Sequence, residues 1–285
     1  MKITPMLRFA ALALLSSANA QAATATCSIS ALPAPTAFSG TYSITLGLQQ
    51  ALSLTVSCTK TSGGPLTGIF TLAPSNGLNP SGSQNRAGTS PNLINYDIYT
   101  NTSCSTLLTN ATQFTMVLAK ANNQTTTQVF SYAGCVPVQT PLPVAGTQAD
   151  TVNITLSSST AGVTIGGTNP SPFSVNVTTT AVCSISTIPN ITLAYGNAFS
   201  STAVTAITSA PVMCSNQLPY TMTVSPTSGV SAGIYYSLSL PASGTGTGLS
   251  QGIAITATAP AGQAGTCAAA TCTGAAQPHT LTVTY

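Results

Sequence analysis

The chain has 285 residues and 43% of them are hydrophobic, yet it carries only five Lys and Arg, two Asp and no Trp. Five scattered cations cannot neutralise a run of phosphates, so the composition excludes nucleic-acid binding. Intrinsic disorder is also excluded, because it goes with low hydrophobicity and high net charge. The polar surface must come from Ser, Thr, Asn and Gln, and a surface with so little self-repulsion associates readily.

The first 22 residues have the pattern of a cleaved secretory signal. Lys2 and Arg8 flank the start, the apolar run 9–15 is too short to cross a bilayer, and small residues follow at Ala18-Asn19-Ala20 or Ala20-Gln21-Ala22. We therefore expect an exported protein. Its remaining charges are three cations and two carboxylates, a net charge of +1: Lys60, Arg86, Lys120, Asp97 and Asp150.

The chain contains an internal repeat. Cys27-Ser28-Ile29-Ser30 recurs as Cys183-Ser184-Ile185-Ser186, and each copy has a second cysteine 31 residues later. Three further features recur in order: an aromatic residue near a glycine, a Tyr-bearing alternating stretch, and a related closing strand. They lie at Phe38-Ser39-Gly40 and Tyr195-Gly196, at 93–100 and 234–240, and at 150–157 and 279–285. These correspondences predict two copies of one domain.

The periodicity predicts strands throughout the mature chain. Residues 52–58, 68–74, 151–157 and 281–285 alternate apolar side chains with Thr or Ser and are rich in β-branched and aromatic residues. Clusters of Gly, Pro, Asn and Ser separate them, and beyond the signal no window has a clear helical period. The expected fold class is all-β, with sandwiches or barrels built from short strands.

Eight cysteines, an even number in an exported protein, indicate disulfides. A metal site is the alternative, but only Cys267 and Cys272 have a short spacing, and no second short-spaced pair accompanies them. We expect no metal and no cofactor. Four cysteines in one domain allow three pairings; the repeat favours Cys27–Cys58 and Cys183–Cys214, with Cys104–Cys135 and Cys267–Cys272 as the remaining pairs.

The two CSIS motifs, the aromatic-glycine element, the second cysteine, the Tyr-rich stretch and the closing DTVNITLS together resemble the spore coat protein U domain. That domain occurs in subunits of archaic, Csu-type chaperone–usher pili. The resemblance covers nearly the whole mature chain as two copies, although the second is shorter and its Cys267 and Cys272 have no clear counterpart. The resulting division is a signal peptide (1–22), a first domain (23–157), a linker (158–182) and a second domain (183–285).

The resemblance implies two tandem immunoglobulin-like sandwiches that lack their last strand. A neighbouring subunit donates that strand from an N-terminal extension, and a periplasmic chaperone fills the gap beforehand. Implied partners are this chaperone, an outer-membrane usher and the next pilin subunit. The implied location is a pilus on the cell surface, reached through the periplasm.

The linker contains a candidate donor strand. In residues 172–182, Phe173, Val175 and Val177 alternate with polar residues, as a strand that fills a sheet requires, and the segment lies where the family's donor extension lies. We expect it to complete the first domain in cis. The alternative is an ordinary linker or an ordinary final strand.

The ends of the chain suggest an asymmetry. Residues 23–26, before Cys27, span at most about 14 Å, too short for a donor strand. The second domain closes with Leu281, Val283 and Tyr285 on a strand that has no successor. We therefore expect a subunit that accepts a strand but offers none, which belongs at the fibre tip.

Three loops are expected at the pole of the first domain that is far from the second. They carry Leu66, Leu107, Leu108, Val163 and Ile165. Grouped exposed apolar residues mark a binding surface, so we expect contact with hydrophobic abiotic or host surfaces, in attachment and biofilm formation. The alternative is that several of these residues belong to the core.

Catalytic patterns are weak. Gly248-Leu249-Ser250-Gln251-Gly252 matches a nucleophile elbow, but no acid follows Asp150 and no helix is predicted there. Asp97 and Asp150 are the only carboxylates for acid–base chemistry, and His279 has no acidic neighbour in sequence. We expect no enzyme. The alternatives to a tip subunit are a shaft or adaptor pilin and a secreted coat protein.

Overall fold

The computed structural model describes residues 22–31, 37–118, 121–266 and 274–285, and every regular element in these ranges is a β-strand. The expectation of an all-β fold is confirmed. The described ranges contain no helix with the length and apolar character needed to cross a membrane. Residues 1–21 of the predicted signal peptide and the predicted Cys267–Cys272 bridge lie outside the described residues.

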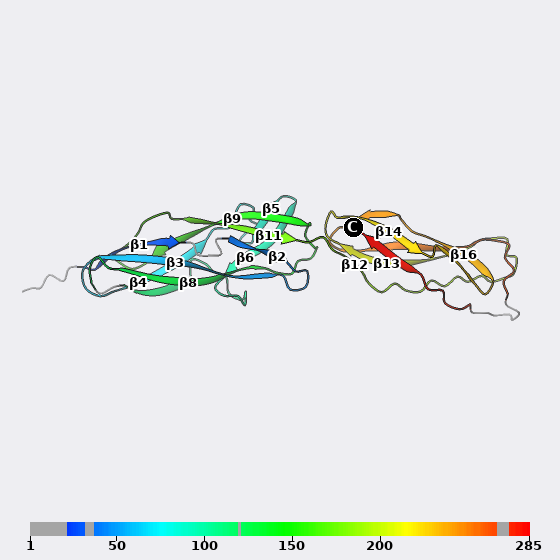
Figure 1. Cartoon of the computed structure of the whole chain (residues 1–285), viewed down its shortest axis with the longest axis horizontal. Helices are drawn as coiled ribbons and strands as arrows, with labels where there is room; N and C mark the ends of the chain where they lie inside the picture. Colours follow the sequence, from blue (N-terminus) through cyan, green and yellow to red (C-terminus); the bar gives the residue numbers. More distant parts are fainter. Residues whose placement is uncertain (1–21, 32–36, 119–120, 267–273) are drawn as a thin grey trace, which may run out of the picture.

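The strands form two sandwiches that lie end to end in an elongated molecule (Figure 1). The first sandwich has a six-stranded sheet in the order β10 (Val163–Ile165), β1 (Thr24–Ala31), β3 (Leu48–Ser62), β8 (Thr125–Val136), β6 (Asn92–Tyr99), β5 (Asn85–Thr89). Its five-stranded sheet has the order β2 (Ala37–Tyr42), β11 (Ser171–Thr179), β9 (Gly146–Ser158), β4 (Leu66–Pro74), β7 (Gln113–Leu118).

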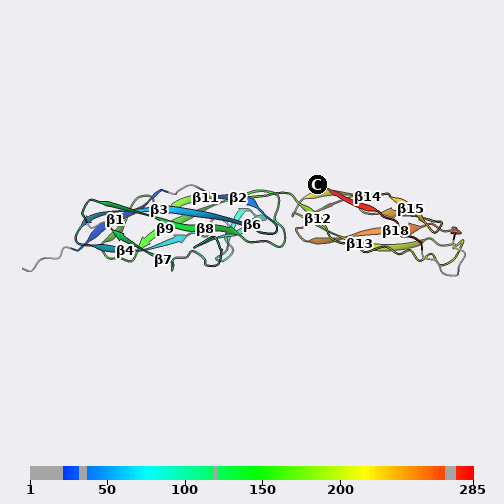
Figure 2. The same ribbon diagram turned by 60° about the horizontal axis from the view of Figure 1, so that its bottom comes forward.

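The second sandwich is built from residues 183–284. Its larger sheet has the order β12 (Cys183–Ile185), β13 (Val204–Cys214), β18 (Ser250–Ala259), β16 (Ile234–Ser239), β15 (Ser228–Ser231). Its smaller sheet has the order β17 (Ser243–Thr245), β14 (Pro219–Ser225), β19 (Thr280–Thr284). Figure 2 shows β13 and β18 on one side of this part and β14 on the other.

The cores follow from the alternation of the strands. Inward side chains of β3 and β9, such as Leu54, Val56 and Ile154, are fully buried between the two sheets of the first sandwich, as a period of two requires. The second sandwich has a much smaller buried apolar cluster among the described residues. It consists of Val212, Cys214, Tyr220 and Met222.

The described residues contain three disulfides. Cys27 of β1 is bonded to Cys58 of β3, and Cys183 of β12 to Cys214 of β13, each between directly opposed residues of neighbouring strands. The third bond joins Cys104, in the connection after β6, to Cys135 of β8.

Strand β11 lies between β9, with which it is antiparallel, and β2, with which it is parallel. Its inward side chains, Phe173, Val175 and Val177, are buried in the core of the first sandwich. The segment singled out as a candidate donor therefore forms an internal strand of the first sandwich.

We expect Val175→Ala to destabilise the first sandwich by about 2 kcal/mol, because two methyl groups leave a fully buried site that can relax only in part. Ser174→Ala, on the exposed side of the same strand, is the matched control and should change stability little. Hydrogen exchange read strand by strand checks this: protection of β9 and β2 should fall while that of β13 and β18 stays the same. Equal losses in the two sandwiches would contradict the assignment.

Candidate functional site

The candidate site is the outer edge of β19. This strand is hydrogen-bonded to β14 on one side, and the described residues place no strand on its other side. In the first sandwich, β9 has β4 on one side and β11 on the other. The closing strands β9 and β19 thus each have one antiparallel neighbour, β4 and β14. They differ on the other side, where β9 pairs with β11 and β19 has no described strand.

Burial differs accordingly. The inward residues of β9, Val152, Ile154 and Leu156, are buried. On β19, Leu281 and Val283 are only partly buried, although they pack against the small core of the second sandwich. The side chain of Tyr285 is 57% exposed. Apolar side chains that a neighbouring strand covers in the first sandwich are therefore accessible in the second.

The segment corresponding to β2 also differs between the two sandwiches. Strand β2 makes its backbone ladder with β11. The repeat aligns this part of the chain with the stretch around Tyr195, and residues 186–200 contain no strand. An extended segment that lacks a hydrogen-bonding neighbour gains little from strand geometry. In the second sandwich, the segment that corresponds to β2 by the repeat is therefore irregular.

Each sandwich contains a glutamine that joins three segments. In the first, the backbone N–H of Gln139 donates to the Tyr42 hydroxyl (2.8 Å), and its side chain accepts from Asn95 N (3.1 Å) and donates to Asn95 O (3.0 Å). In the second, the backbone N–H of Gln263 donates to the Tyr195 hydroxyl (3.0 Å), and its side chain accepts from Tyr235 N (2.6 Å) and donates to Tyr235 O (3.0 Å). The same three hydrogen bonds recur, which supports the equivalence of the two parts.

A buried tyrosine marks the next position in each copy. The Tyr96 hydroxyl donates to Asp150 Oδ2 (2.6 Å), and this carboxylate also accepts from Leu78 N (2.9 Å). Burial, reinforced by the neighbouring Asp150, raises the pKa of Tyr96. In the second sandwich the Tyr236 hydroxyl lies 2.7 Å from Nε2 of His279. The Nδ1 atom of His279 donates to Pro226 O (2.6 Å), because a carbonyl only accepts, and in that tautomer Nε2 accepts from Tyr236.

The other carboxylate is also structural. Asp97 accepts hydrogen bonds from Gln84 Nε2 (2.7 Å), Asn85 N (3.2 Å) and Asn85 Nδ2 (3.1 Å). Burial raises the pKa of Asp97, and these hydrogen bonds oppose that effect. Asp97 and Asp150 are thus engaged with different partners. Ser250 of the elbow-like sequence opens a strand, and no group of three or more His, Cys, Asp or Glu in the described ranges could hold a metal ion.

The two sandwiches meet at a joint built mainly from residues 137–144. Leu142 N donates to Gly248 O (2.8 Å), Gln217 Nε2 donates to Asn92 Oδ1 (2.9 Å), and Val144 forms a parallel bridge with Asn216. Gly248 has φ +74°, and an added Cβ would lie 2.5 Å from Leu142 O, so glycine permits this close approach.

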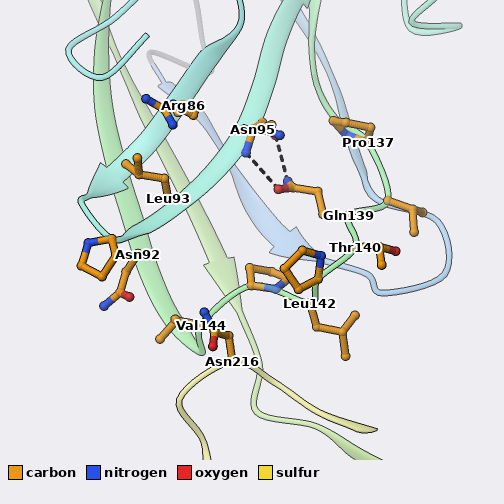
Figure 3. A pocket seen from close by; sticks show the side chains of 14 residues that line it. Arg86, Asn92, Leu93, Asn95, Pro137, Gln139, Thr140, Leu142, Val144 and Asn216 are labelled. Atoms are coloured by element: carbon orange, nitrogen blue, oxygen red, sulfur yellow. Dashed lines mark hydrogen bonds between the residues drawn. The ribbon is translucent and has the colours of Figure 1, made fainter. Parts of the chain in front are cut away.

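A cavity of about 410 Å³ opens beside this joint (Figure 3). Its walls combine the Gln139–Asn95 pair, prolines of the 137–144 segment, Arg86 and, from the second sandwich, Asn216. The guanidinium of Arg86 donates to Asn79 O (2.9 Å) and Pro80 O (3.1 Å) and so fastens the neighbouring loop. The cavity is therefore lined by groups that hold the joint together.

The five residues predicted to form one adhesive pole do not lie together, and that prediction is wrong. Val163 and Ile165 pair with the beginning of β1, and Leu66 follows the end of β3, so these three lie at the far pole. Leu107 forms a bridge with Tyr99, the last residue of β6. Tyr99 is opposite Ala133 of β8, and Ala133 is in turn opposite Ala51 of β3. Ala51 is eleven residues before Ser62, roughly 36 Å along β3.

The physical reason is the course of β6. This strand pairs only with the last residues of β8, from Asp97 opposite Cys135 to Tyr99 opposite Ala133, and the chain turns back there, so the turn after β6 never reaches the far pole. Leu108 is moreover buried in the core, with its N–H donating to Ile98 O (2.9 Å), while Leu107 is 45% exposed.

Comparison with known families decides the membership of the chain. Residues 12–155 match the Spore Coat Protein U domain model, which is half of the chain. The chain belongs to the spore coat protein U domain family. The match ends within β9, so β11 lies outside the matched residues.

Several solved structures are similar to this chain. One is the tip adhesion subunit of the archaic Csu pili of Acinetobacter baumannii in its chaperone complex, at 14% identity, 91% coverage of this chain, 100% of that chain and TM-score 0.41. Another is the CupB6 tip adhesin from Pseudomonas aeruginosa, at 13% identity, 84% and 87% coverage and TM-score 0.35. A third is the CooA pilin from enterotoxigenic Escherichia coli, at 17% identity, 55% and 97% coverage and TM-score 0.31. No curated protein matches the sequence.

Sequence reasoning missed the two glutamines that join the segments of each sandwich. Gln139 and Gln263 each follow a long strand and a proline, Pro137 and Pro260, by two or three residues. That shared spacing is the signal that could have found them. Their partners lie far away in sequence, so the hydrogen bonds themselves could not be inferred.

We expect rising pH to weaken the first sandwich as Asp97 ionises. Its pKa in the fold lies above the ordinary value of 3.8, so the folded state holds the proton more tightly. The free energy of unfolding should therefore fall as pH rises from about 3.8 through the raised pKa. Asp97→Asn should remove this contribution, and guanidinium unfolding of both proteins across that range measures the difference. Since residues 183–285 contain no Asp or Glu, the second sandwich adds no side-chain carboxylate. Parallel pH profiles of the two proteins would refute the expectation.

Proposed function

We propose that the protein is a structural and adhesive subunit of a chaperone–usher pilus, which accepts a donated strand along β19 and ends the fibre at its tip. One observation carries the proposal: the edge of the closing strand is paired with β11 in the first sandwich, and no described strand pairs with that edge in the second. Family membership supports it, because the family resemblance implies a sandwich that lacks its last strand, and the match ends before β11.

An open edge of this kind needs a partner. It presents unpaired backbone N–H and C=O groups beside partly buried apolar side chains, and proteins usually protect such edges with Lys, Pro or a covering segment. The sequence of β19, Thr280–Thr284, has no charge and no proline, and residues 183–285 contain no Lys, Arg, Asp or Glu at all. An added strand satisfies the backbone groups and buries Leu281 and Val283 in one step.

The partners follow from this requirement. A periplasmic chaperone covers β19 before assembly, an outer-membrane usher receives the complex, and the next pilin subunit replaces the chaperone with its own strand. The protein then stands on the cell surface at the end of the pilus. The first sandwich, closed by β11, needs no partner and is available for contact with a surface.

Adhesion is assigned to the far pole of the first sandwich. Leu66, Val163 and Ile165 lie there, partly buried and packed against the core. With no carboxylate near this pole, contact relies on apolar burial, at about 25 cal/mol per Å², and favours hydrophobic surfaces. Leu107 and Leu108 are left out of this surface.

Strand acceptance can be tested with the chain's own donor sequence. A copy of residues 157–179 is appended directly after Tyr285, so that the second sandwich is offered the strand that β11 supplies to the first. We expect exchange of the β19 amides to slow by about tenfold or more, because the strand edge becomes hydrogen-bonded. The unextended chain should be recovered only with its chaperone or as aggregate.

The matched control carries the same extension with Ser in place of the copied Phe173, Val175 and Val177. It keeps the backbone but loses the apolar side chains, so it should protect β19 little. The proposal fails if the unextended chain is a stable monomer whose β19 amides are as protected as those of β9. That result would favour a coat protein.

Surface contact has a separate test. We expect the triple variant Leu66→Thr, Val163→Thr, Ile165→Thr to reduce attachment of piliated cells to polystyrene by about tenfold, because the apolar contact area is lost. Leu107→Thr, an exposed residue away from the pole, is the control and should attach normally. Pilus number is counted in parallel; undiminished attachment with normal piliation would remove the far pole as the adhesive surface.

A further inference from the structure

We propose that the pole of the second sandwich that faces away from the joint is a docking surface for the body of the subunit that donates its strand to β19. This distal pole is formed by Phe199, Val230, Tyr235 and residues 260–266. The inference rests on the proposed function, and it adds a second contact beside the donated strand, with a subunit of the same fold as the partner.

The direction of the strands sets where that subunit must lie. β11 is antiparallel to β9 and leads directly into the second sandwich at the joint. β19 ends close to the joint, where the C-terminus is marked in Figure 1. A donor antiparallel to β19 therefore runs away from the joint and delivers the rest of its subunit to the distal pole.

The joint shows which surface of one sandwich contacts the sandwich that follows it in the chain. The receiving surface of the first sandwich is the segment organised by Gln139, whose continuation bonds to the second sandwich through Leu142 and Val144. The second sandwich presents the turn after its second cysteine, with Asn216 and Gln217, and the Gly248 loop.

The distal pole repeats this receiving surface. Gln263 makes with Tyr195 and Tyr235 the three hydrogen bonds that Gln139 makes with Tyr42 and Asn95. By this correspondence Tyr235 occupies the position of Asn95, which lines the cavity at the joint (Figure 3). The surface that is covered in the first sandwich thus recurs in the second, where no described residue covers it.

Exposed apolar side chains gather at this pole. Phe199 is 70% exposed and its N–H donates to Gln263 O (2.7 Å). Tyr235, which is 45% exposed, is directly opposite Val230, which is 58% exposed. Aromatic side chains held on a fixed backbone are the usual anchors of protein interfaces, and this sandwich has no Lys, Arg, Asp or Glu to oppose burial.

The backbone of Phe199 adds an independent sign. Its φ is +59°, in the left-handed region that a bulky non-glycine residue adopts at an energetic cost. The hydrogen bond to Gln263 O and that from Gly262 N to Ser200 O (2.8 Å) hold this turn in place. An aromatic ring fixed in solvent by a costly turn is positioned for a partner.

Tryptophan reporters test the proposal, because the chain has no Trp of its own. Phe199→Trp and Tyr235→Trp each place a single reporter at the distal pole, and two reporters guard against one that disturbs the fold. Ile185→Trp is the control; Ile185 is 37% exposed on β12 and lies opposite Val212, toward the joint end of β13 and away from the pole. Each reporter is introduced into two full-length chains.

The first chain carries the bare strand, residues 157–179, after Tyr285. The second carries residues 157–285 there, so that the same strand is followed by a complete second sandwich with its own turn after the second cysteine. Acrylamide quenching of the two pole reporters should fall about twofold from the first chain to the second, because a docked aromatic residue loses contact with water. The control reporter should be quenched equally in both.

Hydrogen exchange of β19 separates the two ideas. If both extensions protect β19 but the pole reporters are quenched equally in the two chains, the docking surface is wrong and strand acceptance stands. If neither extension protects β19, strand acceptance fails and the docking inference falls with it. Protection of β19 in both chains, with reduced quenching at the pole in the second alone, supports both.

Discussion

The structure depends on how the outer edge of each closing strand is satisfied. Backbone N–H and C=O groups of an edge strand must find partners, and the hydrophobic side chains beside them must be covered. In the first sandwich β11 does both for β9, and by pairing with β2 it also gives that segment its strand geometry. Without such a strand among its described residues, the second sandwich has an irregular 186–200 segment, a partly exposed β19 and a small core.

The shortage of charge shapes how polar groups are satisfied inside. Long charged side chains are absent from the second sandwich, so amides and hydroxyls make the connections between segments, as Gln139 and Gln263 do in the two copies. Next to each glutamine's partner in sequence is a buried tyrosine, and the two tyrosines bind different side chains. Tyr96 binds Asp150 and Tyr236 binds His279. The geometry is repeated while the chemistry differs, so the tyrosine hydroxyl is the fixed feature and its partner only has to accept a hydrogen bond.

Sequence reasoning succeeded where the signal was local. Alternation identified the strands at β3, β9 and β11, and the repeat gave the cysteine intervals. It failed where tertiary pairing decided the outcome. The turn after β6 was predicted at the far pole, but β6 ends opposite Ala133, near the end of β8, and the chain turns back there and buries Leu108. The hydrogen bonds of the two glutamines join residues up to 97 positions apart, and nothing local in the sequence marks such contacts.

The two ends of the second sandwich also differ in chemistry, and their different tasks explain why. At the joint, backbone and amide groups of Asn92, Gln217 and Gly248 make hydrogen bonds beside the prolines and Leu142 of the 137–144 segment, and no aromatic residue takes part in those bonds. The two sandwiches are linked covalently there, so a high effective concentration holds them together and weak contacts suffice to set their orientation. At the distal pole a partner arrives from solution, and ordering it costs translational and rotational freedom. Burial of large side chains offsets that cost, which accounts for the exposed aromatic Phe199 and Tyr235 at the equivalent surface.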